Sequence, residues 1–172
     1  MISRLRLLSL LMLLAVPLTS ACSQPKGRYQ SAVIIDAAGA PCMKLSDNRE
    51  SRRYHPRLSV IDVYEQGVDG AVSVWQQNYA DQGVQPMVSP DDCVASGALG
   101  SNPFPIFSVG KRYTAVMSGG IVKESSRSES RVYRGHFCMT EKDGKPYVHQ
   151  VQFDKRRQVW AWDACGAATG SE

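Results

Sequence analysis

Short runs of β-branched and aromatic residues recur along the chain from residue 29 onward, separated by clusters of Gly, Asn, Asp and Pro. This arrangement is typical of β-strands joined by turns. No stretch in this region keeps helical periodicity over three turns, although a short helix fits between Asp81 and Ala98. The pattern therefore predicts an all-β domain. The runs that predict its strands are "SAVIID", "CMKL", "LSVIDVYE", "AVSVWQQ", "RYTAVM", "IVKE", "RVYRGHFCM", "YVHQVQF" and "VWAWDA".

Turn signals and side-chain alternation give this prediction more detail. Asp143-Gly144 is the best hairpin signal, because glycine supplies the positive φ that tight hairpin turns require. The "SGG" at 118–120 predicts another turn, between "RYTAVM" and "IVKE". Residues two apart on a strand share a face, so we expect Trp160 and Trp162 to point the same way. Strands at this spacing favour an antiparallel β-sandwich, Ig-like or as a partly open barrel, in one domain over residues 29–172.

The first 21 residues follow a different pattern. Arg4 and Arg6 precede an apolar run that ends at Leu18 and is followed by small residues. The run is too short for a membrane-spanning helix, so residues 1–21 are predicted to be a secretory signal peptide. Small residues directly before Cys22 resemble the bacterial lipobox, in which the cysteine is acylated and becomes the first mature residue. Ordinary cleavage near "TSA" is the alternative, because Thr19 stands where the lipobox more often has Leu.

Acylation of Cys22 would hold the protein on a membrane. Two or three acyl chains exceed the single chain that gives only reversible binding. Ser23 follows the cysteine, whereas Asp at that position is the usual signal for retention in the inner membrane of enteric bacteria. The resemblance therefore favours the periplasmic leaflet of the outer membrane, with residues 22–28 as a lipidated N-terminus and short tether.

Charge and length limit the function classes. The chain has 172 residues and a formal net charge of +4. Loss of the signal peptide leaves 18 basic and 16 acidic residues, a net charge of +2. This small excess argues against nucleic acid as a partner, because a dedicated binder usually shows a basic stripe with interleaved aromatic residues. The remaining length suits a single domain with a real core.

Four cysteines remain in the mature chain. An even number in an exported protein predicts two disulfides. Zinc is the alternative, but no CxxC pair occurs and the three histidines are scattered. We therefore expect no metal and no cofactor. The four cysteines are Cys42, Cys93, Cys138 and Cys165.

The chain contains none of the usual catalytic signatures. It has no GxSxG elbow, HExxH motif, phosphate-binding glycine loop or dinucleotide fingerprint. His136 and Cys138 share a strand face at a spacing of two, but a cysteine in a disulfide is no nucleophile. Asp91 and Asp92 adjoin in "SPDDC", where Asp after Pro is ordinary turn chemistry. We therefore expect a protein that is not an enzyme.

Five segments follow one another along the chain: "GAPCMKL", "VSVWQQ", "PDDCVASG", "VGKRYTAVM" and "VYRGHFCM". In this order they resemble the type VI secretion immunity periplasmic lipoproteins. The resemblance runs from about Val33 to Met139 and implies a small single-domain β protein that protects the cell from a secreted effector toxin. Two features depart from the family: the basic insertion "SDNRESRRYHPR", and a tail that carries an additional cysteine.

The shared segments also suggest one disulfide pairing among the three that four cysteines allow. Cys42 and Cys138 both lie in these segments, and we expect them to face each other across the core. Cys93 would then pair with Cys165.

Toxin binding needs exposed side chains on a rigid scaffold, and loops supply them. The candidates lie in the basic insertion and in a later charged turn, and Arg and Tyr are enriched at interface hot spots. The alternative is that both loops are merely solvated. Two other function classes remain open: a tethered inhibitor of lysozyme or protease, and a structural lipoprotein of the envelope. The candidate partner-binding residues are Arg49, Arg52, Arg53, Tyr54, His55, Arg57, Lys155, Arg156 and Arg157.

Overall fold

A computed structural model describes residues 28–94, 104–123 and 127–166. The signal peptide and Cys22 lie outside the described residues, as does nearly all of the tether. Within the described ranges, strands make up most of the chain and helices are short. The elements are β1 (Tyr29–Ala37), β2 (Ala40–Leu45), α2 (Arg49–Tyr54), β3 (Arg57–Gly67), β4 (Gly70–Asn78), β5 (Arg112–Val122), β6 (Ser128–Lys142), β7 (Lys145–Val151), β8 (Phe153–Asp154), β9 (Val159–Trp160) and the 3₁₀ helix η3 (Trp162–Cys165).

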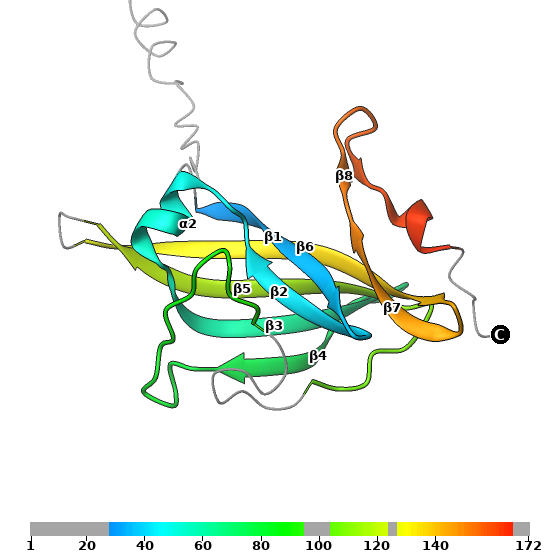
Figure 1. Cartoon of the computed structure of the whole chain (residues 1–172), viewed down its shortest axis with the longest axis horizontal. Coiled ribbons are helices and arrows are strands. Elements are labelled where there is room, and N and C mark those ends of the chain that lie inside the picture. Colours follow the sequence, from blue (N-terminus) through cyan, green and yellow to red (C-terminus); the bar gives the residue numbers. More distant parts are fainter. Residues whose placement is uncertain (1–27, 95–103, 124–126, 167–172) are drawn as a thin grey trace, which may run out of the picture.

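The fold is all-β and sandwich-like, in one domain. Seven strands form a sheet in the order β2-β1-β6-β5-β3-β4, and β7 also pairs with β6. All pairs in this sheet are antiparallel except β1 with β6, which is parallel over three residues. Figure 1 shows the β1–β2 hairpin crossing in front of β3 and β5. The sheet thus folds over itself without closing into a barrel.

The predicted hairpin at Asp143-Gly144 is confirmed. Both residues have positive φ, of 53° and 72°, and the flanking Lys142 and Lys145 pair directly. These are the conformations of a type I′ turn, whose twist matches that of the strands it joins. The β1–β2 hairpin uses the same turn.

The predicted turn at "SGG" is wrong, because β5 continues through it to Val122. Gly119 lies in mid-strand where β3 approaches closely: a Cβ there would overlap the carbonyl oxygen of Arg57. The register between β3 and β5 shifts beside this contact, between Leu58 and Val60. The glycine is therefore needed for close backbone approach rather than for a turn.

The predicted helix at 81–98 is also absent from residues 81–94, while residues 95–98 lie outside the described part. The α-helix of the described residues lies instead in the basic insertion, as α2. Asn48 caps it by accepting hydrogen bonds from the backbone N–H groups of Glu50 and Ser51, at 2.9 and 3.0 Å. The Ser51 hydroxyl accepts in turn from the Asn48 N–H, at 3.2 Å. This reciprocal cap satisfies donors that a six-residue helix otherwise leaves to solvent.

The main core lies between the β1–β2 hairpin and the inner face of the sheet. Ile34 and Met43 of the hairpin pack with residues such as Ile61, Met117 and Tyr133, all at most 1% exposed. A second, smaller cluster forms on the outer face of β6 and β7, beneath the C-terminal segment. It contains Cys138, Val151 and Cys165, with Trp160 and Trp162 packed against it.

Candidate interaction surfaces

The two disulfides join Cys42 to Cys93 and Cys138 to Cys165, with Cα–Cα distances of 5.5 and 5.9 Å. The prediction of two bridges is confirmed, but the predicted pairing is wrong. Cys42 pairs across the hairpin with Ile35, on the opposite face from Ile34 and Met43 of the main core, and is itself 1% exposed. Cys138 lies on the outer face of β6, so the two layers separate the cysteines that were expected to meet.

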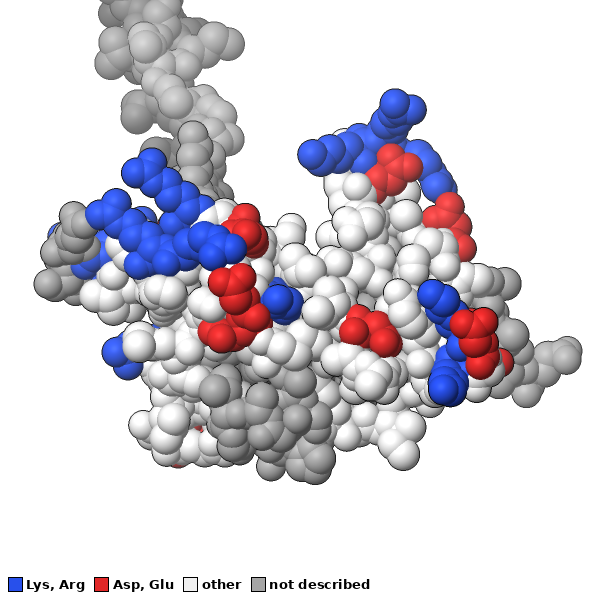
Figure 2. Space-filling view, viewed as in Figure 1, with Lys and Arg blue, Asp and Glu red and all other residues white. Residues whose placement is uncertain are grey.

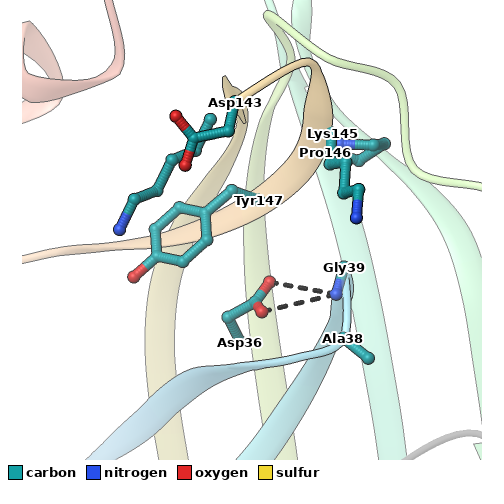
Figure 3. A pocket seen from close by; sticks show the side chains of 8 residues that line it. Asp36, Ala38, Gly39, Asp143, Lys145, Pro146 and Tyr147 are labelled. Atoms are coloured by element: carbon teal, nitrogen blue, oxygen red, sulfur yellow. Dashed lines mark hydrogen bonds between the residues drawn. The ribbon is translucent and has the colours of Figure 1, made fainter.

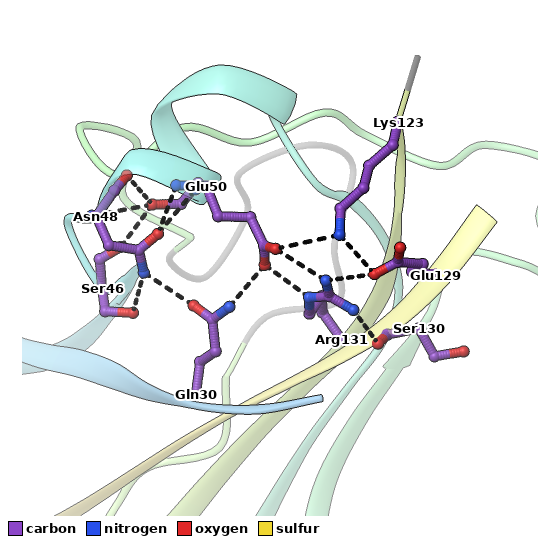
Figure 4. Close-up of polar contacts among 9 residues, drawn as sticks. Gln30, Ser46, Asn48, Glu50, Lys123, Glu129, Ser130 and Arg131 are labelled. Carbon is purple, nitrogen blue, oxygen red and sulfur yellow. Dashed lines mark hydrogen bonds and ion pairs between the residues drawn. The ribbon is translucent and has the colours of Figure 1, made fainter. Parts of the chain in front are cut away.

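The basic insertion is held to the sheet by a network of charged and polar groups that sequence analysis did not find (Figure 4). Arg131 of β6 is only 5% exposed, and it donates to Glu50 of α2 from Nε at 2.6 Å and from Nη2 at 2.8 Å. Nη2 also donates to Glu129, which pairs with Lys123 at 2.8 Å. Gln30 of β1 donates to Glu50 at 2.7 Å.

This network lowers the pKa of Glu50, chiefly through the hydrogen bonds from Arg131. The same bonds raise the pKa of Arg131 above its ordinary value. The pair joins residues 81 apart in sequence, and neither the strand pattern nor the insertion carried a signal for it. Its role is to fix α2 against the start of β1 and β6.

Arg52 is the most strongly paired of the predicted partner-binding residues. Its guanidinium donates to both carboxylate oxygens of Asp47, at 2.6 and 2.8 Å, and to Asp91 at 3.2 Å. Arg53 lies over the Tyr54 ring, with its Cζ 5.4 Å from the ring centroid. The charge of Arg52 is thus largely matched by two carboxylates before any partner arrives.

The remaining residues of this group flank the helix. Arg49 begins α2 and His55 ends it in a left-handed conformation, with φ of 40°. Arg57 is the first residue of β3. All three are exposed, so the structure places them on the surface as predicted.

The second predicted group forms the tip of the β8–β9 hairpin. Lys155, Arg156 and Arg157 are all exposed, and Asp154 shapes the turn by accepting from the backbone N–H groups of Arg156 and Arg157 at 2.8 and 3.1 Å. The guanidinium of Arg157 also contacts Asp163 at 3.1 Å. Figure 2 shows the Lys and Arg side chains over α2 and those at this tip as separate groups. The structure therefore does not merge the two predicted loops into one patch.

Aromatic side chains adjoin the second group. Phe153 is 41% exposed and Val159 is 42% exposed, and the Phe153 and Trp160 rings form a T-shaped pair with a centroid distance of 5.2 Å. Trp160 and Trp162 are half-buried, and their ring centroids lie 3.9 and 5.6 Å from that of His136, so both face the same side. The predicted strand through both residues is wrong, because β9 ends at Trp160 and Trp162 begins η3. Together these residues form what we call the C-terminal surface: Phe153, Lys155, Arg156, Arg157, Val159, Trp160 and Trp162.

His136 supports this surface from below. Its Nδ1 lies 2.9 Å from the Thr114 hydroxyl, while Nε2 is buried without a hydrogen-bond partner in the described chain. Burial, assisted by the nearby charge of Arg134, lowers the pKa of His136 to about 4. The imidazole is therefore neutral at pH 7. Cys138 shares the same face as predicted, but its sulfur is bonded to Cys165.

A cleft of about 660 Å³ lies where the β1–β2 and β6–β7 turns meet (Figure 3). Tyr147 lies on one side of it and Lys145 on the other. Asp36 between them accepts hydrogen bonds from the backbone N–H groups of Gly39 at 3.2 Å and Val148 at 2.9 Å. The carboxylate of Asp36 thus serves to join the two hairpins.

The carboxylates of Asp91 and Asp92 do not form a pair. Asp91 contacts Arg52, whereas Asp92 accepts from the backbone N–H of Ser89 at 2.6 Å. That bond and the Ser89 hydroxyl lower the pKa of Asp92. Across residues 28–94, 104–123 and 127–166, no group of three His, Cys, Asp or Glu side chains is placed to hold a metal ion. The helices of this part of the chain are too short to cross a bilayer.

Comparison of the chain with protein-family models, with curated proteins and with solved structures gave no match.

Proposed function

We propose that the chain is a periplasmic lipoprotein that neutralises a type VI secretion effector toxin by binding it directly. The observation that carries this proposal is the C-terminal surface, where partly exposed aromatic side chains adjoin exposed basic ones. Trp and Arg are enriched among residues that dominate binding energies, and aromatic residues are enriched at interface cores. The order of the five shared segments and the lipobox-like sequence before Cys22 support the same function.

The scaffold under this surface suits a binding role. The Cys138–Cys165 disulfide covalently joins η3 to β6, and Trp160 and Trp162 pack on His136. A surface held in this way loses less conformational freedom on binding than a free loop does, so more of the contact energy is left for affinity. Two disulfides are also compatible with an extracytoplasmic compartment.

The β8–β9 tip is the better candidate for the toxin contact of the two basic groups. Arg52 already has two carboxylate partners, whereas Lys155 and Arg156 form no ion pair within the described chain. Unmatched charges at a protruding tip attract an acidic partner over roughly one Debye length and accelerate encounter.

The test is survival of cells that carry a toxin in the periplasm. Effectors secreted by the host bacterium's type VI system are expressed singly, with and without the chain, and binding is measured by calorimetry. We expect one effector to be bound and its toxicity abolished. If none is bound, while lysozyme is inhibited at micromolar concentration, the inhibitor function replaces the proposed one.

Charge-reversed variants test which of the two basic groups contacts the toxin. Charge reversal of Lys155, Arg156 and Arg157 should slow association about tenfold or more at low salt and weaken protection. The same reversal at Arg28, Arg49 and Arg57 changes net charge equally and should leave toxin binding within about twofold, because those residues lie on other elements.

The neutralisation step has its own test. Protection by occupancy requires that binding and survival change together in every folded variant. A folded His136→Ala variant that binds the toxin normally yet fails to protect would show that neutralisation involves more than binding.

A further inference from the structure

Arginines from four separate segments lie at one end of the sheet. Arg57 of β3 pairs in register with Gly120 of β5, near the β5–β6 turn. Arg127 directly precedes β6 at the same turn. Arg28 directly precedes β1, whose first residue is in register with Val132 near the start of β6.

Helix α2 adds a fourth arginine to this end. Its capping residue Asn48 donates to Gln30 of β1 at 2.9 Å, and Gln30 donates to Glu50, so the first turn of α2 lies beside the beginning of β1. Arg49 is the first residue of that turn. We call Arg28, Arg49, Arg57 and Arg127 the basic end.

The charges of the basic end are unmatched within the described chain. The neighbouring cations Arg52, Lys123 and Arg131 all pair with carboxylates. None of the four arginines of the basic end forms an ion pair with a described residue, and all four are exposed. Figure 2 shows basic side chains gathered over this end of the molecule. Four unmatched arginines form an electrostatic footprint for an anionic partner.

The position of the basic end along the chain indicates which partner. Cys22 lies six residues before Arg28. Even a fully extended chain covers at most about 3.6 Å per residue, so an acylated Cys22 would keep Arg28 within roughly 20 Å of the membrane surface. Tyr29, next in sequence, is 51% exposed, and the Arg28 guanidinium lies 5.8 Å from its ring centroid. Exposed Tyr and Arg side chains suit the boundary between lipid headgroups and water.

We propose that the basic end binds the anionic phospholipid headgroups of the membrane that carries the anchor. The proposal rests on acylation of Cys22, which is part of the proposed function. Four arginines spread over four segments fit a diffuse anionic layer better than a single ligand. Each Lys or Arg near an anionic leaflet strengthens binding about fivefold, equivalent to roughly 1 kcal/mol. Contact at this end would orient the domain on the membrane as well as tether it.

The test uses the chain from residue 22 with Cys22→Ser, which keeps every described element and carries no acyl chain. It is sedimented at low salt with phosphatidylcholine vesicles, with and without phosphatidylglycerol at about a third of the lipid. Arg28→Gln, Arg49→Gln and Arg57→Gln are combined in one variant. Because each of the three substituted arginines contributes about fivefold, we expect this variant to partition into anionic vesicles about 100-fold less than the unsubstituted chain.

The matched control combines Lys155→Gln, Arg156→Gln and Arg157→Gln, which removes the same net charge from the other basic group. We expect it to lower partitioning by about threefold at most, since its charges lie away from the bilayer and are screened. Circular dichroism checks the fold of both variants. The substituted arginines of the basic end donate no side-chain hydrogen bond to a described residue, so the first variant is expected to fold.

Equal losses in the two variants would overturn the proposal, because they would show only an effect of net charge. It would also be overturned by equal binding to neutral and anionic vesicles. A third contrary result is loss of toxin binding in the basic-end variant with vesicle binding intact, which would make this end a protein-binding surface. The vesicle assay contains no toxin, so its failure and that of the proposed function are distinguishable.

Discussion

Removing the carboxylate of Glu50 should loosen α2 from the sheet and destabilise the domain. Arg131 is 5% exposed and donates two hydrogen bonds, of 2.6 and 2.8 Å, to the Glu50 carboxylate. Breaking a fully buried ion pair costs about 3–5 kcal/mol, because one charge stays buried without its partner. Here the Glu50 side chain is 24% exposed and Arg131 keeps Glu129, so we expect Glu50→Gln to cost about 2 kcal/mol.

The assay is urea unfolding with both disulfides intact, arranged as a double-mutant cycle with Arg131→Met. Removing both partners leaves no orphaned charge, so the double variant should cost less than the sum of the single ones, with a coupling of about 1–2 kcal/mol. Asp163→Asn supplies the control, because the Arg157–Asp163 pair has similar chemistry but side chains that are 60% and 65% exposed. That substitution should change stability little, since exposed pairs contribute little.

The pH dependence gives an independent check. The folded pKa of Glu50 is lowered, so the folded chain binds fewer protons than the unfolded chain near the ordinary value of 4.5. The stability from this carboxylate is therefore present above pH 4.5 and is lost as pH falls through the lower folded pKa. Glu50→Gln should have a shallower acid dependence than the wild type. The reasoning would be refuted if the double-mutant cycle were additive and the acid dependence of stability were the same in Glu50→Gln as in the wild type.

Three further predictions concern other sites. The folded pKa of His136 is about 4 against an ordinary 6.5, so between these pH values the unfolded chain binds a proton that the folded chain does not. The free energy of unfolding should therefore fall by about 2 kcal/mol from pH 6.5 to 4. Melting curves of His136→Gln should lack this pH-dependent fall. Gly119→Ala should cost about 1–3 kcal/mol by urea unfolding, because its Cβ meets backbone, whereas Gly120→Ala should cost less, because its Cβ meets the movable Ser128 hydroxyl at 3.1 Å. Cys22→Ser should release the protein from washed membranes, while the wild type partitions into detergent; identical partitioning would exclude acylation.

Strand positions could be predicted because their signals are local. The alternation within "YVHQVQF" and the residue pair Asp143-Gly144 depend on the backbone geometry of a few neighbouring residues. The helix in the insertion had a weak local signal, the spacing of Asn48 and Ser51, which resembles a capping box without its usual Glu or Gln. No local signal marked Gly119 as a position that requires glycine, because the close contact is with β3, more than 50 residues earlier in the chain.

The candidate surfaces could also be predicted only in part. Composition identified the two basic segments, and their Lys and Arg side chains are exposed as predicted, although the first segment forms helix α2 rather than a loop. Only the tertiary structure shows that Arg52 is paired with Asp91, 39 residues away, and that Arg49 and Arg57 are not paired with any described residue. Sequence composition counts charges, whereas the availability of a charge depends on which carboxylate folds beside it.

The sequence by itself determined the all-β class, the presence of two disulfides and the segments that would be exposed. These follow from side-chain periodicity, cysteine number and turn chemistry, each of which acts over a few residues or over the whole composition. The tertiary structure decided which cysteines meet, because Cys42 and Cys138 lie on faces turned away from the main core and are covered by different segments. It likewise decided how α2 is attached, since the bond from Arg131 to Glu50 spans 81 residues. Such pairings depend on how the layers stack, and no local pattern specifies that.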